Sequence, residues 1–533
     1  MNNLQTVKEQ LIFDINKRLE DKIIEPTNAE LLKKLITNAD STNEAMMIAE
    51  LGTTYKRTGF HFDKRLEKMG SDIKYLKKNT DLSFNNNDNA TTHKLIIGDN
   101  YDALQQLLIT HRSMIDVIYI DPPYASDSMG NFAETNYTNA ITRDNLLSML
   151  YPRLQLARQL LSDNGVIFCS IDDKNYAYVK CLFDEVFTEQ NFVGSIIRQV
   201  MEGGKSDSAG IAIQHEYCLI YAKEKSFVKM QKKKVEHQDH YTKTDAYFNE
   251  RGFYYLKPLE NGGLGYVASL DYAIEGPDGA AIYPGDYHGD NGYRWVWSKD
   301  KYLNALNKGM IEFVQSQKDK SKYKVYYKVY EKVDTDGNPA EKSLPFGSLY
   351  LNGFTNRQGI NDLKSVFGDR VFSYPKPISF LIELLKMSTN KNSIVLDFFA
   401  GSGTTGQATL ALNKEDGGTR QFILCTNNEV TDANPNGIAY DVTSKRLKRV
   451  MTGECYDGSS DFEWIKKNEL LGSSLNVFEI ESVNNTEQSN GKSPFDVIDE
   501  TCYDVPRFES VQEKIIWVCN NFENTQKYLK EEE

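Results

Sequence analysis

Cysteines and long apolar runs are scarce in this chain. Only 7 of the 533 residues are cysteines, and no two of them form a C-x-x-C pair, which argues against a disulfide framework and against a cysteine zinc site. No stretch approaches the roughly 18 apolar residues that a membrane-spanning helix needs. Residues 1–18 carry charges where a signal peptide would have its apolar stretch, so we expect a cytoplasmic protein without a membrane partner.

An excess of positive charge is also missing. The net charge is −13, from 62 Lys and Arg against 75 Asp and Glu, which disfavours a nucleic-acid partner for the chain as a whole but leaves room for a local basic face. Clusters of lysine in a sequence often belong to solvent-exposed faces or protect the edge of a sheet from pairing. Two lysine clusters occur, the second interleaved with Tyr323, Tyr326, Tyr327 and Tyr330: Lys223, Lys225, Lys229, Lys232, Lys233 and Lys234; and Lys318, Lys320, Lys322, Lys324, Lys328 and Lys332.

The pattern of predicted elements divides the chain into five parts. Residues 1–90 are expected to be helical up to about residue 80, with a polar linker at 85–89. Strands and helices alternate over 91–222 and again over 346–453, which predicts an α/β fold with a mostly parallel sheet covered on both faces. Between them, residues 223–345 are rich in Gly, Tyr and turn signals and predict a β-rich insert. Residues 454–533 are acidic and mixed, with a linker at 484–493 and a final helix expected over 514–529.

The first candidate site is Asp121-Pro122-Pro123-Tyr124, directly after an apolar strand. In open parallel sheets, ligands bind beyond the carboxyl ends of the strands. Two prolines make the turn rigid and remove N–H donors, so the Asp121 carboxylate and the Pro122 carbonyl form an acceptor-only pocket beside the Tyr124 ring. This set suits a planar group that carries an NH₂. The alternative is a strand that merely ends in a tight proline turn.

The second candidate site runs from Leu396 to Gly406, again a strand, a glycine loop and a helix. Its glycines match the dinucleotide pattern G-x-G-x-x-G, so a nicotinamide cofactor is the rival interpretation. Asp397 would repel a pyrophosphate at the helix N-terminus but would attract a cofactor with ammonium or sulfonium charge. Glu429, after the next strand, can accept hydrogen bonds from ribose hydroxyls.

The two motifs together resemble the S-adenosylmethionine-dependent amino-methyltransferases of DNA. The D-P-P-Y half precedes the insert and the F-x-G-x-G half follows it, an order similar to the β group of these enzymes. Further stretches look like the modification subunit of type III restriction–modification systems. These are residues 98–108, 129–173, 215–223, 372–377, 396–406 and the tail 511–529. The resemblance is strong over 93–222 and 346–450, and the insert resembles no known family.

The resemblance implies a Rossmann-like methyltransferase core, in which 91–222 is the catalytic half and 346–453 the cofactor half. It also implies that 1–90 is a helical region, 223–345 a target-recognition domain, and 454–533 an α/β extension for oligomerisation or partner contacts. We expect the insert to read the base sequence, with the lysines and tyrosines of 318–332 against phosphates and bases.

For the site residues, the resemblance implies that Asp121 and Pro122 accept from the exocyclic amine of the target base, while Tyr124 stacks on that base. Lys376 would face the carboxylate of S-adenosyl-L-methionine, and Glu429 would hold its ribose. Asp99 and Asn100 would lie near the adenine edge, although a Gly-Asp turn after a strand is also common for local reasons. The residues implied to line the methionine part are Asp397, Phe399, Ala400, Gly401, Gly403, Thr404 and Thr405.

The predicted reaction is methyl transfer to adenine N6 in double-stranded DNA. The base must be flipped out of the duplex, and catalysis would come mainly from positioning and from acceptors aimed at the amine. Neither a covalent nucleophile nor a metal is required, and His237 and His240 lack a third ligand at metal spacing. Cytosine N4 stays open as the target atom, because the preference for adenine rests on family analogy. A DNA-reading scaffold for a nuclease and an RNA or protein amide methyltransferase with the same core are further alternatives.

The predicted partners follow from what the chain lacks. Gly491-Lys492-Ser493 would need a glycine at position 486 to be a phosphate-binding loop, and Thr486 stands there. No helicase or nuclease motor is therefore expected in this chain, and the resemblance implies both a separate restriction subunit that supplies it and a homodimer.

Overall fold

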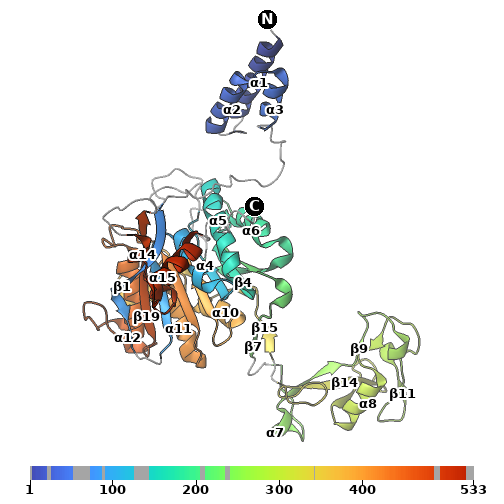
Figure 1. The fold of residues 1–533 in the computed structure, drawn as a ribbon. Helices are drawn as coiled ribbons and strands as arrows, with labels where there is room; N and C mark the ends of the chain where they lie inside the picture. Colours follow the sequence, from blue (N-terminus) through green and yellow to red (C-terminus); the bar gives the residue numbers. More distant parts are fainter. Residues whose placement is uncertain are drawn as a thin grey trace.

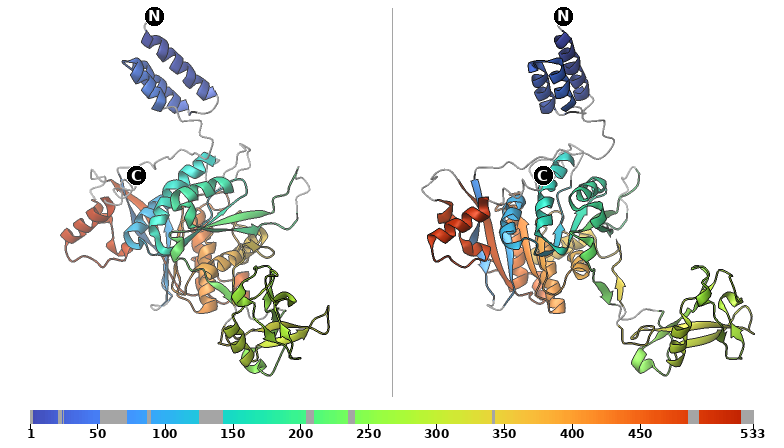
Figure 2. Two further views of the ribbon diagram at one scale, coloured as in Figure 1. Left: turned by 90° about the vertical axis from the view of Figure 1, so that its right-hand side faces the viewer. Right: turned by 45° about the vertical axis from the view of Figure 1, so that its right-hand side comes forward.

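A computed structural model of the protein shows a helical bundle, an α/β core and a smaller β-rich module, with the core in the middle (Figures 1 and 2). The structure describes residues 3–20, 24, 26–51, 72–86, 90–124, 143–203, 210–234, 240–340, 343–484 and 493–523. Within these ranges no helix combines the length and the apolar character needed to cross a membrane. Several predictions lie outside the described residues: part of the family-like stretch at 129–142, His237, the linker positions 87–89 and 485–492, and the expected helix end at 524–529.

Three helices form the N-terminal bundle, and these are α1 (Asn3–Glu20), α2 (Pro26–Asn38) and α3 (Thr42–Leu51). Their apolar faces meet around Ile15, Ala29, Ile36 and Ala45, which are almost completely buried. Helical spacing of apolar residues therefore predicted this part of the chain correctly. In Figure 2 the bundle stands apart from the core.

A sheet of ten strands forms the core, in the order β1-β19-β2-β18-β17-β3-β4-β6-β5-β16. The pairs from β19 across to β4 are parallel, as is β16 with β5, whereas β1–β19, β4–β6 and β6–β5 are antiparallel. The predicted mostly parallel α/β sheet is thus confirmed. The strands are β1 (Asp72–Phe84), β2 (Thr92–Ile97), β3 (Ile115–Ile120), β4 (Leu161–Ile171), β5 (Phe192–Gln199), β6 (His215–Ala222), β16 (Leu349–Tyr350), β17 (Ile394–Asp397), β18 (Gln421–Thr426) and β19 (Ser474–Asn484).

Helices cover both faces of this sheet, because successive side chains of a buried strand point to opposite sides. In β3, Ile118 and Ile120 pack with helices α4 to α6, whereas Val117 and Tyr119 pack with α10 and α11. The first set is α4 (Asn100–His111), α5 (Arg143–Leu160) and α6 (Tyr176–Phe187). The second set is α10 (Ile378–Ser388) and α11 (Thr404–Asp416). Residues of α9 (Asn356–Phe367) and α12 (Lys445–Thr452) pack with those of β2 and β18, and the short α13 (Glu463–Lys467) follows along the chain.

Strand β1 corrects the expectation of helix up to about residue 80. Asp72–Phe84 pairs with β19, and its partners lie about 400 positions later, as in Asp72 with Asn484. Pairing of this kind overrides local periodicity and leaves little trace in the neighbouring sequence. Strand β19 also lies between β1 and β2, so the C-terminal region contributes to the core sheet. The region continues with α14 (Pro494–Val497), α15 (Val511–Val518) and a π-helical turn over Cys519–Glu523.

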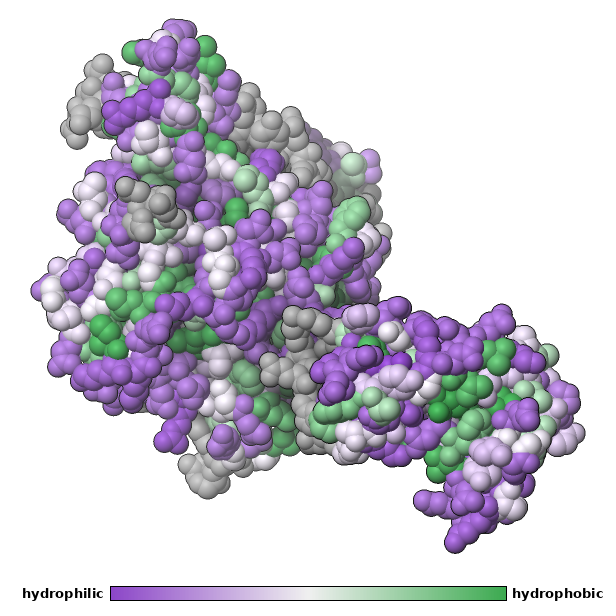
Figure 3. All heavy atoms as spheres, turned by 90° about the horizontal axis from the view of Figure 1, so that it is seen from below, coloured by the Kyte–Doolittle hydropathy of each residue, from purple (hydrophilic) through white to green (hydrophobic). Residues whose placement is uncertain are grey.

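The inserted module is β-rich, as expected, and has its own core around Trp295, Trp297, Tyr302 and Tyr327. A ribbon of β7 (Lys232–Lys234) and β15 (Ser343–Pro345) connects it to the α/β core. Figure 3 shows it as a projecting lobe with mostly hydrophilic side chains on the visible face. Its remaining elements are α7 (Phe248–Arg251), β8 (Tyr254–Pro258), β9 (Glu260–Asn261), β10 (Ile274–Glu275), β11 (Ala281–Ile282), β12 (Arg294–Trp295), α8 (Lys299–Asn307), β13 (Ile311–Gln315) and β14 (Tyr323–Tyr330), with β13, β14 and β8 in one antiparallel sheet.

Candidate functional site

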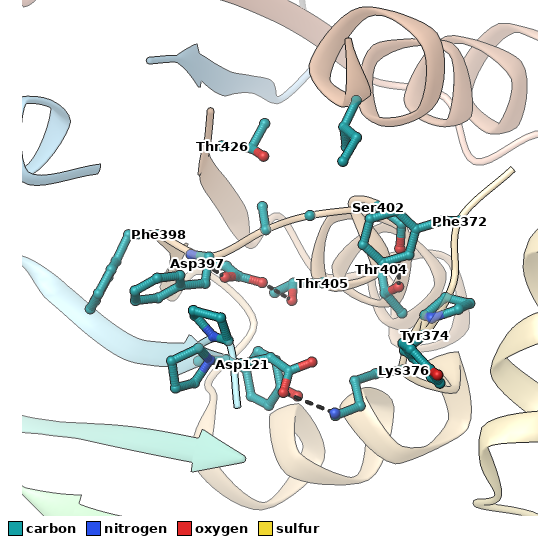
Figure 4. A pocket seen from close by; sticks show the side chains of 18 of the residues that line it. Asp121, Phe372, Tyr374, Lys376, Asp397, Phe398, Ser402, Thr404, Thr405 and Thr426 are labelled. Atoms are coloured by element: carbon teal, nitrogen blue, oxygen red, sulfur yellow. Dashed lines mark hydrogen bonds and ion pairs between the residues drawn. The ribbon is translucent and has the colours of Figure 1, made fainter. Parts of the chain in front are cut away.

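A cavity of about 360 Å³ lies at the carboxyl ends of β3 and β17. These two strands are parallel neighbours, with Val395 opposite Val117 and Leu396 opposite Ile118. Asp121 follows β3 directly and Asp397 ends β17, so parallel pairing brings the two sequence motifs to one edge of the sheet. Figure 4 shows both aspartates facing the same cavity. The two candidate sites are therefore two sides of one pocket.

On the β3 side, Asp121 is engaged by the ammonium of Lys376. The distance from Lys376 Nζ to Asp121 Oδ1 is 2.8 Å, and the same Nζ donates to the Tyr124 hydroxyl at 2.9 Å. Tyr124 in turn donates to Asp121 Oδ1 at 3.0 Å. Burial raises the pKa of Asp121, while the charge of Lys376 acts in the opposite direction. Lys376 thus lies with the D-P-P-Y motif and also lines the cavity (Figure 4). Its contact with a cofactor carboxylate, which the resemblance implied, stays a prediction.

Two further charges complete this cluster, namely Arg198, which is buried, and Glu216, which is partly buried. Glu216 Oε2 lies 3.4 Å from Lys376 Nζ and 2.7 Å from Arg198 Nη2. Burial alone would raise the pKa of Glu216, but Lys376 and Arg198 hold it at about 2. Both residues were missed by the sequence analysis. Their signal was a charged side chain in a largely apolar strand, since Arg198 lies in β5 and Glu216 in β6.

On the β17 side, a glycine loop leads into helix α11. Gly401 and Gly403 have φ angles of +48° and +77°, a region that residues with a side chain seldom adopt. Asp397 is buried, accepts from Thr405 Oγ1 at 2.5 Å and from the Phe399 N–H at 3.0 Å, and burial raises its pKa to about 7. A buried carboxylate with this pKa suits a ligand that brings positive charge.

Asp99 and Asn100 lie at the start of α4, where Asp99 caps the helix by accepting from the Tyr101 N–H at 2.8 Å. Asn100 donates to the Phe398 carbonyl at 2.8 Å, and Arg153 donates to both Asp99 and Asn100. The pair lines the cavity and also ties α4 to the glycine loop. These contacts support the local interpretation of this turn, whereas a place near the adenine edge of a cofactor stays a prediction.

Glu429 follows β18 and does not itself line the cavity, although Thr426 and Asn427 from the same strand end do. Its Oε2 atom is buried without a hydrogen-bond partner, and burial raises its pKa to about 7. A buried carboxylate oxygen without a partner could accept a hydrogen bond from a hydroxyl group of a ligand.

Most of the predicted site residues line the cavity, with Gly403 and Glu429 as the exceptions. The lining residues that the sequence analysis missed are Tyr119, Glu216, Asn356, Phe372, Tyr374, Pro375, Leu381, Phe398, Ser402, Thr426, Asn427 and Ile438. Several of them, such as Phe372 and Tyr374, are neighbours of predicted residues in the sequence. In the part of the chain that the structure describes, no group of three or more His, Cys, Asp or Glu side chains could hold a metal ion.

The second lysine cluster is less available than its composition suggested. Tyr327 and Tyr330 are buried in the core of the module, and Lys324 and Lys328 form ion pairs with carboxylates of the module. Val325 and Tyr327 alternate along β14 on the face that packs on the core, and Tyr330 is buried at the end of the strand. The exposed lysines of this cluster are Lys318, Lys320, Lys322 and Lys332.

Comparison with known proteins adds to this geometry. The model of a family described as DNA methylase matches residues 115–433, and the model of an uncharacterised conserved protein matches residues 8–117. The StyLTI Mod subunit of a type III restriction–modification enzyme from Salmonella typhimurium is 32% identical over 68% of this chain. The type II methyltransferase M.KpnI from Klebsiella pneumoniae is 30% identical over 72% of this chain and 92% of its own length. Among solved structures, the complex of M1.HpyAVI with SAM is 14% identical over 66% of this chain and 98% of its own, with a TM-score of 0.32.

The matches differ in how much of each relative they cover. This chain spans 58% of the length of the StyLTI Mod subunit and 62% of that of the EcoPI Mod subunit from Escherichia phage P1. The DNA methylase model covers more than half of this chain, and the match to M.KpnI covers nearly all of that enzyme. Most of the residues that line the cavity between the D-P-P-Y motif and the glycine loop lie within residues 115–433, and the chain belongs to the DNA methylase family.

Proposed function

We propose that this protein transfers a methyl group from S-adenosyl-L-methionine to adenine N6 in double-stranded DNA, as the modification subunit of a type III restriction–modification system. The observation that carries the proposal is the shared cavity, in which Asp121 and Asp397 stand at the ends of adjacent parallel strands. The names of the type III relatives support the assignment to such a system.

The residues on the β17 side fit S-adenosylmethionine. The buried Asp397 carboxylate suits its positive charge, and the orphaned Oε2 of Glu429 suits a ribose hydroxyl. The glycine loop and the start of α11 would hold its amino-acid part, and Asp99 and Asn100 would lie near its base. When bound, the cofactor supplies an electrophilic methyl group on a sulfonium.

The residues on the β3 side suit an amine as the methyl acceptor. Asp121 and the Pro122 carbonyl would accept hydrogen bonds from the exocyclic NH₂ and stabilise the positive charge that develops on its nitrogen. Tyr124 would stack on the flipped base. Asp121 Oδ1 already accepts from the ammonium of Lys376 and the hydroxyl of Tyr124, so an incoming amine would share this carboxylate with them.

Expression in a host without DNA methylation, followed by mapping of modified bases across the genome, tests the proposal. We expect N6-methyladenine at one sequence motif. Modification of cytosine N4 would favour the alternative target atom. An unmodified genome, despite cofactor binding by the purified protein, would favour a DNA-reading scaffold and overturn the proposed activity. The homodimer, the restriction subunit as partner and the cytoplasmic location remain predictions of the same proposal.

Cofactor affinity should depend on pH. Burial raises the pKa values of both Asp397 and Glu429 to about 7, so below that pH each must lose a proton before it can serve as a carboxylate acceptor. We therefore expect the affinity for S-adenosylhomocysteine to rise from pH 5.5 to pH 7.5, by up to about tenfold per unit for each coupled proton. Calorimetry in buffers of different ionisation enthalpy measures the protons released on binding. The double variant Asp397→Asn/Glu429→Gln should bind more weakly and without this slope, and an unchanged slope would contradict the assignment.

The exposed lysines of the module should contribute to DNA affinity. We expect Lys318→Gln/Lys320→Gln to weaken duplex binding and to make the slope of log K against log salt shallower, by about one unit for each phosphate that the protein no longer neutralises. Fluorescence anisotropy over a range of salt concentrations measures both effects. Lys466→Gln/Lys467→Gln, two exposed lysines on α13, is the matched control. If the two double variants gave equal slopes of log K against log salt, Lys318 and Lys320 would not belong to the DNA-binding surface.

A further inference from the structure

The fully buried guanidinium of Arg446, in helix α12, lies against the glycine loop. Its Nη1 donates to Thr404 Oγ1 at 2.7 Å, to Ser402 Oγ at 3.2 Å and to the Ser402 carbonyl at 3.1 Å. Its Nε donates to Gln407 Oε1 at 2.7 Å. Arg446 therefore contacts the loop and the first turn of α11 through neutral groups alone.

No carboxylate forms an ion pair with Arg446 among the residues that the structure describes, and its Nη2 is buried without a hydrogen-bond partner. Burial lowers the pKa of Arg446 to about 10, and the charge of Asp362 offsets this only in part. The carboxylate of Asp362 is itself occupied by the Ile378 N–H and by Gln358. Arg446 thus remains charged at neutral pH, and a buried charge without an anionic partner is costly.

The two residues whose hydroxyls Arg446 contacts both line the cavity. Ser402 and Thr404 line it and are almost completely buried (Figure 4). Each hydroxyl accepts a hydrogen bond from Nη1, and a hydroxyl that accepts can still donate its own hydrogen. Their oxygens are 3.2 Å apart, so one hydroxyl donates to the other at most, and the remaining hydrogen is free for a ligand. Thr404 also begins α11, where N–H groups and the helix dipole favour an anion.

The β3 side of the cavity has no positive charge to spare for an anion. Lys376 lies between Asp121 and Glu216, and Arg198 pairs with Glu216, so two cations and two carboxylates balance. The cofactor of the proposed function carries a carboxylate on its amino-acid part. Among the described residues, Arg446 on the β17 side is a cation next to the cavity that has no ion-pair partner.

We infer that Arg446 holds the carboxylate of the cofactor through the hydroxyls of Ser402 and Thr404, the role that the sequence had given to Lys376. This inference rests on the proposed function, because it concerns the same cofactor. Arg446 is a positioning residue in this arrangement: it orients the two hydroxyls and supplies the charge, while the hydroxyls make the contact.

Binding of two ligands that differ only in the carboxylate tests the inference. Wild-type protein and variants are titrated with S-adenosylhomocysteine and with its decarboxylated analogue, by calorimetry. We expect Arg446→Met to lower the affinity for S-adenosylhomocysteine at least tenfold and the affinity for the decarboxylated analogue less than twofold. Arg449→Met is the control on the same helix, because Arg449 donates to the Val366 carbonyl and stacks on Phe367 and Phe462; it should change neither affinity.

Thr404→Val keeps the buried charge and removes one hydroxyl, so it tests the same contact if Arg446→Met does not fold. We expect Thr404→Val to lower the affinity for S-adenosylhomocysteine about fivefold and to have little effect on the affinity for the analogue. A loss that is equal for both ligands would show that Arg446 only supports the loop, and unchanged binding of both ligands would also overturn the inference. The proposed function fails separately, if the wild-type protein binds neither ligand.

Discussion

Asp121→Ala should reduce the rate of methyl transfer by at least about 100-fold, the usual effect of removing one preorganised electrostatic partner of the transition state. The carboxylate is the acceptor at the carboxyl end of β3, and its contacts with Lys376 and Tyr124 hold it in place. Positive charge grows on the exocyclic nitrogen during transfer, so the loss should fall on the chemical step. Single-turnover methylation with saturating cofactor and DNA measures it directly.

Affinity for the cofactor should remain measurable in Asp121→Ala, because Asp397 and the glycine loop come from the other half of the core. Asp121→Asn keeps the shape of the side chain and one acceptor oxygen, so its methylation rate should lie between those of the alanine variant and the wild type. Asp173→Ala is a matched control, since Asp173 follows the neighbouring strand β4 but does not line the cavity. Full activity of Asp121→Ala would contradict the proposed mechanism.

Gly359→Ala should impair both stability and catalysis, although Gly359 lies in α9 and outside the cavity lining. A Cβ at this position would stand 2.1 Å from the Pro375 carbonyl oxygen and 2.9 Å from the backbone carbon of Lys376. Both are backbone atoms, so the segment that carries Lys376 must move. Overpacking of this kind costs about 1–3 kcal/mol, against a gain of about 1 kcal/mol from replacing glycine in a helix.

The effect of Gly359→Ala on catalysis follows from the contact that Lys376 makes with Asp121, because a shift of the backbone moves its ammonium away from the carboxylate. We expect at least a tenfold lower methylation rate at a temperature where the variant is folded, and a lower midpoint of denaturant unfolding. Gly347→Ala is the control, because no atom lies within 4 Å of a Cβ built there. A Gly359→Ala variant with wild-type stability and rate would show that the packing of α9 against the Lys376 segment is not critical.

Local sequence was a sufficient guide wherever an element is defined by its own residues. Apolar periodicity indicated that the N-terminal region is helical, and the alternation of strands and helices indicated the α/β core, although strand β1 was missed. The two motifs were also readable, because a D-P-P-Y turn and a glycine loop depend on a few adjacent residues. Their position at strand ends then predicted an edge of a parallel sheet.

The partners of individual side chains were not readable in the same way. Lys376 stands beside Pro375 and Pro377 in the sequence. Its contacts are Asp121 and Tyr124, which follow β3, and Glu216, which lies in β6. Arg198 and Glu216 were visible as charges in apolar strands, yet nothing local indicates that they pair with each other. Arg446 lies in a basic, strongly amphipathic helix, and its place behind the glycine loop depends on how α12 packs.

The sequence alone determined the α/β class, the two motifs and the kind of chemistry that each supports, because these properties reside in residues close together along the chain. The tertiary structure decided that β3 lies beside β17 and that β1 pairs with β19. It also decided which cation neutralises which carboxylate and which tyrosines of the insert are buried. Such contacts join residues that can be hundreds of positions apart, and they form only because the whole sheet and its covering helices pack together.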